Sequence, residues 1–305
     1  MTGIRPVSFG TATFAVRSNP QQIHFLTSMK NIVVPTDYSE NATHAMHYAA
    51  ALAQKAHARL VLYHSFPYPV VTDLPPDILQ GFIDNTIAEH LERLNEIKQS
   101  VEKKYAIEVG CVAEVGSVMR DLPTIMEREK GDLAVMGLRG ANPVASILMG
   151  SSTTDILRQG TVPLLIVPGT AAFKSPERIL FACDNPLIEN PAMLRPLKDL
   201  ATLFSAEIEV YMVDGSQKVH GQPQPPRPSN LEEHFNKIKH VYTFEMAEGV
   251  REQILQAIGE SKADLLAMIP RHHSVWAYLF DKSDTLSVAL QSTVPMLVLA
   301  EKSAA

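Results

Sequence analysis

The 305-residue chain contains the same series of segments twice, in the same order. The short apolar run that ends in Asp37 recurs as the run that ends in Asp184, and Leu60–Tyr63 recurs as Ile208–Tyr211. The other matched pairs are Asp132–Met136 with Asp264–Met268 and Thr161–Pro163 with Thr293–Pro295. A repeat of this length predicts two similar domains, each long enough to bury a core of its own.

Within the first copy, short apolar runs alternate with longer segments of helical periodicity. The expected strands are residues 32–34, 60–66, 107–115, 132–136 and 163–167, and the expected helices are residues 41–58, 77–104, 122–130 and 151–158. Strands that alternate with helices need crossover connections, so we expect a parallel sheet with helices on both faces. The fold class is therefore α/β, with two tandem doubly wound domains.

The second copy is shorter than the first. Between its second and fourth strands lie a Pro/Gln-rich loop, residues 221–228, and a short helix expected at residues 231–239. Turn-forming residues between the copies predict a hinge. We place the first domain at residues 29–170 and the second at residues 176–300.

Residues 1–28 differ from the rest of the chain, since they contain Arg5 and Arg17 but no acidic residue. This composition is loosely that of a transit peptide, without the continuous apolar core of a secretory signal. We interpret Met29 as the start of the folded unit. Residues 1–28 are then an N-terminal extension that is disordered, cleaved or upstream of the true translation start.

Charge and cysteine content exclude several classes of protein. The net charge is -6, which gives no electrostatic reason to expect a nucleic acid or an anionic membrane as partner. No segment is apolar over about 18 residues, so we expect no transmembrane helix. Cys111 and Cys183 are the only cysteines, which excludes a disulfide framework and a zinc cluster and favours a reducing cytoplasm.

A glycine motif follows the fourth strand of the first copy. Gly137 and Gly140 are followed by nine residues and then by Gly150–Thr153, which leads into a helix. In open parallel sheets, ligands bind at the carboxyl ends of strands where the strand order reverses. Glycines there let a polyphosphate approach the backbone, and helix N–H groups and hydroxyls can bind its oxygens. Asp37, at the end of the first strand, is placed to accept hydrogen bonds from a ribose or a base.

The strand that ends in Asp37, the G-x2-G-x9-G-[ST] motif and the closing strand at residues 163–167 resemble the universal stress protein family, in its ATP-binding subgroup and tandem form. The resemblance implies five parallel strands per domain, bound ATP or AMP, and dimers made by pairing of the final strands. It also implies slow ATP hydrolysis at most, with Mg2+ bridging the phosphates of ATP. The implied ligand set is Pro35, Thr36 and Asp37 around the adenosine, and Gly137, Gly140, Gly150, Ser151 and Thr153 at the ribose and phosphates.

Ser152 stands where the family usually has an apolar residue, which leaves open which hydroxyl contacts the phosphate. The second copy departs much further. Aligned through Met136 and Met268, it has Pro270, His273 and Ser283 at the three glycine positions and Asp284 at the position of Ser151. A carboxylate there repels a phosphate. We therefore expect one nucleotide site per chain, in the first domain. Asp184 is retained, as is typical of a turn or cap residue, and the second copy keeps a role in packing or binds a different ligand.

Three functions remain open. The first is an ATP- or AMP-binding stress-response or signalling module with an unknown protein partner. The second is an ATP-dependent enzyme, either a slow nucleotide hydrolase or a phosphotransferase. The third is a scaffold that binds no nucleotide. The chain has no Walker P-loop, no G-x-G-x-x-G fingerprint and no catalytic triad order, so we name no catalytic residue.

Three smaller features have structural explanations as well as functional ones. His44 and His47 share a helical face but lack a third metal ligand nearby. The run Arg271–His273 can bind an anion or can pack with the aromatic residues that follow it. Cys183 lies beside Asp184, whose carboxylate raises a thiol pKa, so we expect a thiol that is inert and lies in the core.

The last strands of the two copies are both apolar, at residues 163–167 and 295–299. An unpaired apolar edge promotes aggregation. We therefore predict that these strands pair within the chain, forming a pseudo-twofold dimer of its two domains; a homodimer of whole chains stays open.

Overall fold

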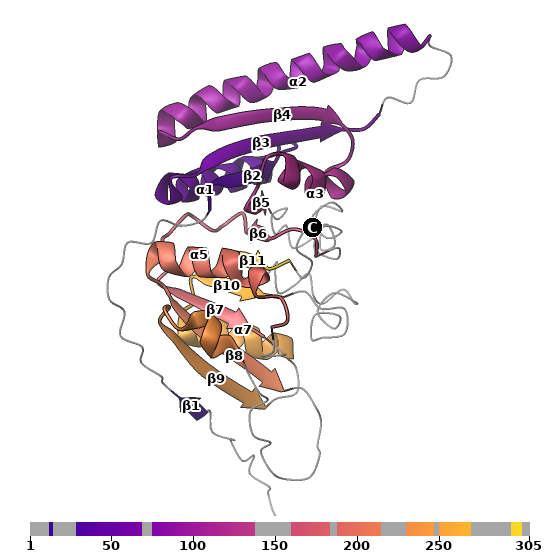
Figure 1. The fold of residues 1–305 in the computed structure, drawn as a ribbon. Coiled ribbons are helices and arrows are strands. Elements are labelled where there is room, and N and C mark those ends of the chain that lie inside the picture. The colour runs from indigo at the N-terminus through magenta and orange to yellow at the C-terminus, as the bar shows by residue number, and fades with distance from the viewer. Residues whose placement is uncertain are drawn as a thin grey trace, which may run out of the picture.

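The computed structural model describes residues 12–14, 29–68, 75–137, 160–183, 188–214, 230–246, 250–269 and 294–300. Within these residues the strands form one sheet, in the order β1-β9-β8-β7-β10-β11-β6-β5-β2-β3-β4 (Figure 1). The sheet has an N-terminal half, from β6 to β4, and a C-terminal half, from β9 to β11.

The N-terminal half consists of five parallel strands. They are β2 (Asn31–Pro35), β3 (Arg59–Phe66), β4 (Val109–Val115), β5 (Leu133–Gly137) and β6 (Leu164–Val167). Its helices are α1 (Glu40–Ala56), α2 (Pro76–Tyr105) and α3 (Val118–Arg128). Helix α3 begins four residues before the expected position, because Ser117 starts it and Pro123 is accommodated inside it.

The C-terminal half also has five parallel strands. They are β7 (Arg178–Ala182), β8 (Glu207–Asp214), β9 (His240–Met246), β10 (Leu265–Met268) and β11 (Met296–Val298). Its helices are the 3-10 helix η1 (Pro191–Leu194), α5 (Arg195–Phe204), α6 (Leu231–Phe235) and α7 (Val250–Ser261). The helix expected at residues 231–239 ends at Phe235, since β9 begins at His240.

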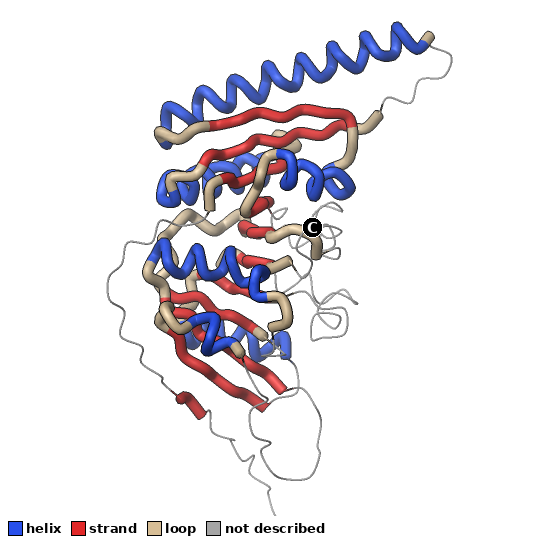
Figure 2. The backbone as a smooth tube through the Cα atoms, viewed as in Figure 1, coloured by secondary structure: helices blue, strands red, loops and turns tan. Residues whose placement is uncertain are grey.

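Helices pack along a mostly parallel sheet, which confirms the predicted α/β class (Figure 2). Buried side chains form two cores, one on each face of the sheet. Helices α1, α2, α5 and α6 contribute to one core, and α3 and α7 to the other. Side chains of each strand alternate between the two, as expected for extended backbone. In β2, for example, Ile32 and Val34 lie in the first core and Val33 in the second.

The two halves join through β6 and β11, which pair with each other as predicted and run antiparallel. Ile166 lies opposite Met296, Leu165 opposite Leu297 and Leu164 opposite Val298. Because both strands feed the same two cores, each core continues from one half of the sheet into the other.

The hinge between the halves is packed against helices on both sides. The Phe173 ring makes an edge contact with Tyr48 of α1, at 5.1 Å between centroids, and a tilted contact with Phe204 of α5. Arg195 of α5 also forms an ion pair with Asp132, in the other half. Contacts between side chains therefore hold the two halves together, in addition to the strand pairing in the sheet.

Equivalent aspartates hold the first strand of each half. Asp132 accepts hydrogen bonds from the backbone N–H groups of Lys30 and Asn31, where β2 begins, at 2.6 and 3.1 Å. Asp264 accepts from the two residues at the start of β7, at 2.8 and 3.2 Å. These contacts lie at matching positions of the internal repeat.

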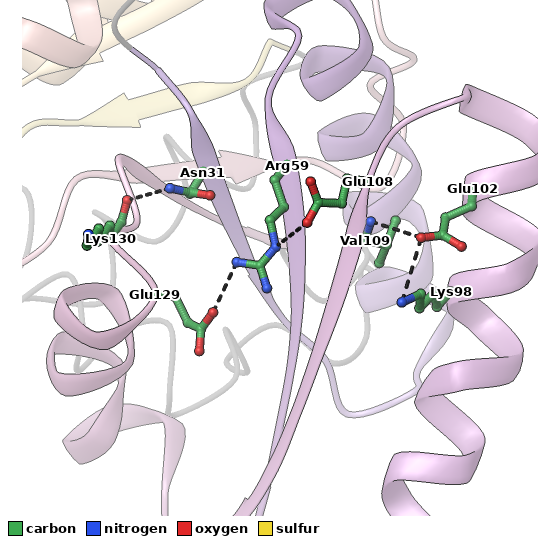
Figure 3. A network of polar contacts seen from close by, with 8 residues as sticks. All are labelled: Asn31, Arg59, Lys98, Glu102, Glu108, Val109, Glu129 and Lys130. Atoms are coloured by element: carbon green, nitrogen blue, oxygen red, sulfur yellow. Dashed lines mark hydrogen bonds and ion pairs between the residues drawn. The ribbon is translucent and has the colours of Figure 1, made fainter.

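A polar network covers the amino ends of the strands in the N-terminal half (Figure 3). The Arg59 guanidinium contacts Glu108 at 3.3 Å and Glu129 at 3.1 Å, which links β3 to the segment before β4 and to the end of α3. A Cβ at Gly110 would lie 2.2 Å from Arg59, so glycine leaves room for this side chain. The network lies at the amino ends of the strands, whereas Asp37 lies at their carboxyl ends.

Part of the N-terminal extension pairs with the sheet. Ala12–Phe14 form β1, which lies antiparallel to β9 with Thr13 opposite Thr243. A strand at these three residues differs from a disordered extension; the alternatives of a cleaved segment and of a true start at Met29 stay predictions. An edge strand has unpaired backbone N–H and C=O groups, so an extended segment that lies beside it can form hydrogen bonds with it.

Among the described residues, no helix combines the length and apolar character needed to cross a membrane.

Candidate functional site

The candidate site lies at the carboxyl ends of the strands in the N-terminal half. Strand β2 pairs with β3 on one side and with β5 on the other. The chain therefore leaves β2 toward β3 and later returns to its other side, and the strand order reverses at β2. Asp37 follows the end of β2 directly, at this point of reversal.

Side-chain hydrogen bonds shape the turn from β2 into α1. The Thr36 hydroxyl accepts from the Tyr38 N–H at 3.1 Å, and the Asp37 carboxylate accepts from the Ser39 N–H at 3.0 Å. Ser39 is the N-cap of α1 and accepts from the Ala42 N–H at 3.2 Å. Tyr38 has a φ of 63°, in the left-handed region, which costs a non-glycine residue free energy and needs support from its surroundings.

Of the three residues predicted to surround adenosine, only Asp37 is exposed. Pro35 is buried within β2, and Thr36 is 8% exposed. Pro35 thus ends the strand, the Thr36 hydroxyl shapes the turn, and the Asp37 side chain lies at the surface.

Gly137 has a packing role in addition to its predicted one. A Cβ at this position would lie 2.4 Å from the carbonyl oxygen of Asn41 and 2.9 Å from its carbonyl carbon. The missing side chain lets the end of β5 approach the first turn of α1, so helix packing alone accounts for glycine at residue 137.

The remaining predicted site residues lie outside the described part of the chain. They are Gly140, Gly150, Ser151, Ser152 and Thr153 in the first copy and Asp184, Pro270, His273, Ser283 and Asp284 in the second. The run Arg271–His273 lies outside it too. Their assignment stays a prediction from the sequence.

The structure brings a group of side chains to the turn that the sequence analysis missed. We call it the histidine cluster and define it as Tyr38, His64 and Phe66 together with His90 and Arg93 of α2. The rings of His64 and His90 are 4.2 Å apart, and the Phe66 ring is 4.9 Å from His90. The Arg93 guanidinium lies 3.9 Å over the Tyr38 ring.

Hydrogen bonds connect the histidine cluster to the turn. His64 Nδ1 lies 2.8 Å from the Thr36 carbonyl oxygen, and His90 Nδ1 lies 3.2 Å from the Tyr38 hydroxyl. Burial lowers the pKa of His64, and nearby His90 and Arg93 lower it further, against the opposing effect of the Thr36 carbonyl and Asp37. Burial raises the pKa of Tyr38. Both groups are therefore neutral at pH 7.

The other candidates have structural partners. His44 Nε2 lies 2.9 Å from the Ala171 carbonyl oxygen, and His47 Nδ1 lies 3.2 Å from the Tyr105 hydroxyl, so the two histidines contact different groups. Cys183 is buried in the core, as expected. The described residues contain no group of three or more potential metal ligands.

An exposed carboxylate at a strand-order reversal, beside a helix N-terminus, is typical of doubly wound α/β proteins that bind ligands at this edge. The family model of the universal stress protein family matches residues 29–168. A universal stress protein of Thermus aquaticus is 30% identical over 144 residues, which cover 45% of this chain and 98% of that protein. One from Methanocaldococcus jannaschii is 25% identical over 139 residues, 45% of this chain and 81% of that protein. The chain belongs to the universal stress protein family.

Similarity of fold extends over both halves of the chain. The crystal structure of a universal stress protein from Archaeoglobus fulgidus matches with a TM-score of 0.67 at 20% sequence identity. The matched region covers 90% of this chain and 98% of the Archaeoglobus fulgidus chain. A functionally unknown protein from Pseudomonas aeruginosa covers 90% of this chain and 93% of its own, with a TM-score of 0.57 at 14% identity.

Proposed function

We propose that the protein binds ATP or AMP at the carboxyl edge of its N-terminal half and acts as a stress-response or signalling module. The observation that carries the proposal is the position of Asp37, an exposed carboxylate where the strand order reverses. Such a carboxylate can accept hydrogen bonds from ribose hydroxyls or from a base. Family membership and the glycine motif after β5 support the same ligand.

Contacts among the described residues support the adenosine part of this proposal. Thr36 and Ser39 hold the turn that presents Asp37, and Gly137 ends the neighbouring strand close to α1. The motif at Gly140 and Gly150–Thr153 would bind the phosphates through backbone N–H groups and hydroxyls. Mg2+, when present, would neutralise charge between the phosphates of ATP.

We propose further that the nucleotide binds in a first domain, residues 29–170, and that a second domain, residues 176–300, is a diverged copy without the phosphate site. The loss of all three motif glycines from the second copy supports this division. The equivalent contacts of Asp132 and Asp264 support a duplicated origin for the two halves. A protein partner that responds to the bound nucleotide, in the cytoplasm, completes the proposal.

The proposal is tested on the purified full-length chain. Denaturation followed by mass spectrometry should release ATP or AMP that copurifies with the protein. Calorimetric titration of the nucleotide-free chain should then give a stoichiometry near one. A stoichiometry near two would contradict the assignment to the first domain, and the absence of any binding would contradict the function.

Replacing Asp37 should weaken binding without changing the fold. In Asp37→Ala the exposed carboxylate is lost, and we expect a loss of about 1 to 3 kcal/mol in nucleotide binding, the range for a hydrogen bond to a charged group. Asp77→Ala, which removes an exposed carboxylate from the start of α2, is the matched control and should bind like the parent. Equal affinity of both variants, by calorimetry, would place the nucleotide elsewhere.

A further inference from the structure

Two members of the histidine cluster, His64 and His90, contact the residues on either side of Asp37. His64 reaches the turn from β3 and is 8% exposed. His90 and Arg93 reach it from α2, through the hydroxyl and the ring of Tyr38. Thr36 and Tyr38 are thus each held by a side chain from another element.

The His64 contact fixes the protonation of its ring. A carbonyl oxygen can only accept a hydrogen bond, so His64 Nδ1 carries a proton and donates it to the Thr36 carbonyl oxygen. In the neutral ring Nε2 is then without a proton. The peptide that joins Thr36 to Asp37 is therefore oriented by a neutral imidazole.

The His90 contact supports the strained residue of the turn. Tyr38 has a left-handed backbone conformation, and its side chain is held between the His90 ring, to which its hydroxyl bonds, and the Arg93 guanidinium. A held side chain keeps the backbone in a conformation that it would otherwise leave. Asp37 lies between the two held residues.

We propose that His64 and His90 are positioning residues for the Asp37 turn, and that the turn binds adenosine well only while His64 is neutral. This inference rests on the proposed function, since it concerns the adenosine part of the same ligand. Neither residue needs to touch the ligand, because each acts through the backbone of the turn.

Charges around the cluster explain the dependence on protonation. The titratable and charged groups that face His64 and Tyr38 are His90 and Arg93 on α2, Asp37 after β2 and the Cys111 thiol on β4. Protonation of His64 would place a second cation beside the Tyr38 ring, which already has the Arg93 guanidinium 3.9 Å over it. Repulsion between these two cations favours separation of α2 from the turn, and a charged His64 also attracts the Asp37 carboxylate away from a ligand.

Adenosine is the probe that isolates this effect, since it has no phosphate whose own titration would alter binding. We expect the affinity of the parent for adenosine to fall at least threefold when the pH is lowered from about 8 to about 5, because histidine becomes charged within this range. Circular dichroism at both values confirms that the chain is folded. Its stability should also fall below about pH 6.5, because a histidine with a lowered pKa binds protons in the unfolded chain before it does so in the folded one.

Two substitutions separate positioning from simple packing. His64→Asn keeps an N–H donor near the position of Nδ1 but does not titrate, so it should bind adenosine within about threefold of the parent at pH 8 and lose the pH dependence. His64→Leu fills similar space without a donor and should bind about three- to tenfold more weakly at pH 8, the worth of one hydrogen bond. His90→Leu removes the partner of the Tyr38 hydroxyl and should weaken binding at pH 8 by a similar factor.

The outcomes distinguish this inference from the proposed function. If the parent binds neither adenosine nor ATP at pH 8, the proposed function is wrong. If the parent binds adenosine equally at both pH values, or if His64→Asn keeps the pH dependence of the parent, the positioning role is wrong and the nucleotide site stands.

Discussion

Ile166→Asp is expected to unfold both halves of the chain together. Ile166 is fully buried in β6, opposite Met296 of β11, and belongs to a core that contains residues of both halves. The substitution removes apolar burial and places a carboxylate among apolar side chains. We expect the free energy of unfolding to fall by about 4 kcal/mol or more, a large part of the roughly 5 to 15 kcal/mol typical of folded proteins.

Urea denaturation followed by circular dichroism measures this loss. Ile166→Val is the matched control, since it keeps the strand and the apolar character, and it should cost about 0.5 to 1.5 kcal/mol. The interface between the halves would not be essential if Ile166→Asp cost as little as the control. The same conclusion would follow if the two halves, expressed separately, were stable monomers without affinity for each other.

Gly137→Ala is expected to destabilise the chain and to weaken nucleotide binding at the same time. The new methyl group would lie 2.4 Å from a backbone oxygen of Asn41, so either the end of β5 or the first turn of α1 must move. Overpacking of this kind costs about 1 to 3 kcal/mol, and we expect a value near the upper end because the obstructing atoms are backbone. Movement of α1 would also displace the Asp37 turn that precedes it.

Gly259→Ala is the control for the loss of a glycine as such. Gly259 lies in α7, where an added Cβ would meet no atom within 4 Å beyond the backbone of the helix itself. The change to alanine should therefore stabilise the helix by about 0.5 to 1 kcal/mol. In denaturant unfolding, we therefore expect the free energy of unfolding to fall for Gly137→Ala and to rise for Gly259→Ala. A neutral Gly137→Ala would mean that α1 packs less closely on β5 than the structure indicates.

Local patterns in the sequence were sufficient to predict most of the fold. Apolar runs gave the strands, and the matching runs at residues 163–167 and 295–299 predicted the pairing of β6 with β11. Contacts between distant segments were harder to predict. Nothing near Ala12–Phe14 in the sequence indicates a partner at β9, because an edge strand accepts many extended segments.

The site shows the same division. Asp37 could be identified because it ends a strand in a motif, whereas the histidine cluster depends on His90, which reaches the turn from the middle of a long helix. The position of His64 could have indicated the cluster, because His64 lies near the carboxyl end of β3, the strand next to β2. Ligands bind at the carboxyl ends of strands where the strand order reverses, which is the same reason that Asp37 was selected. The packing role of Gly137 could not be predicted, because the sequence does not show how closely α1 approaches β5.

The antiparallel pairing of β6 with β11 has a consequence for how this protein can change over time. In an assembly of two identical chains, any substitution is present in both subunits, so a change that benefits one subunit must be tolerated by the other. Here the two sides of the pairing are different stretches of one chain. Each half can therefore acquire substitutions alone, while its partner is always made in equal amount and always attached.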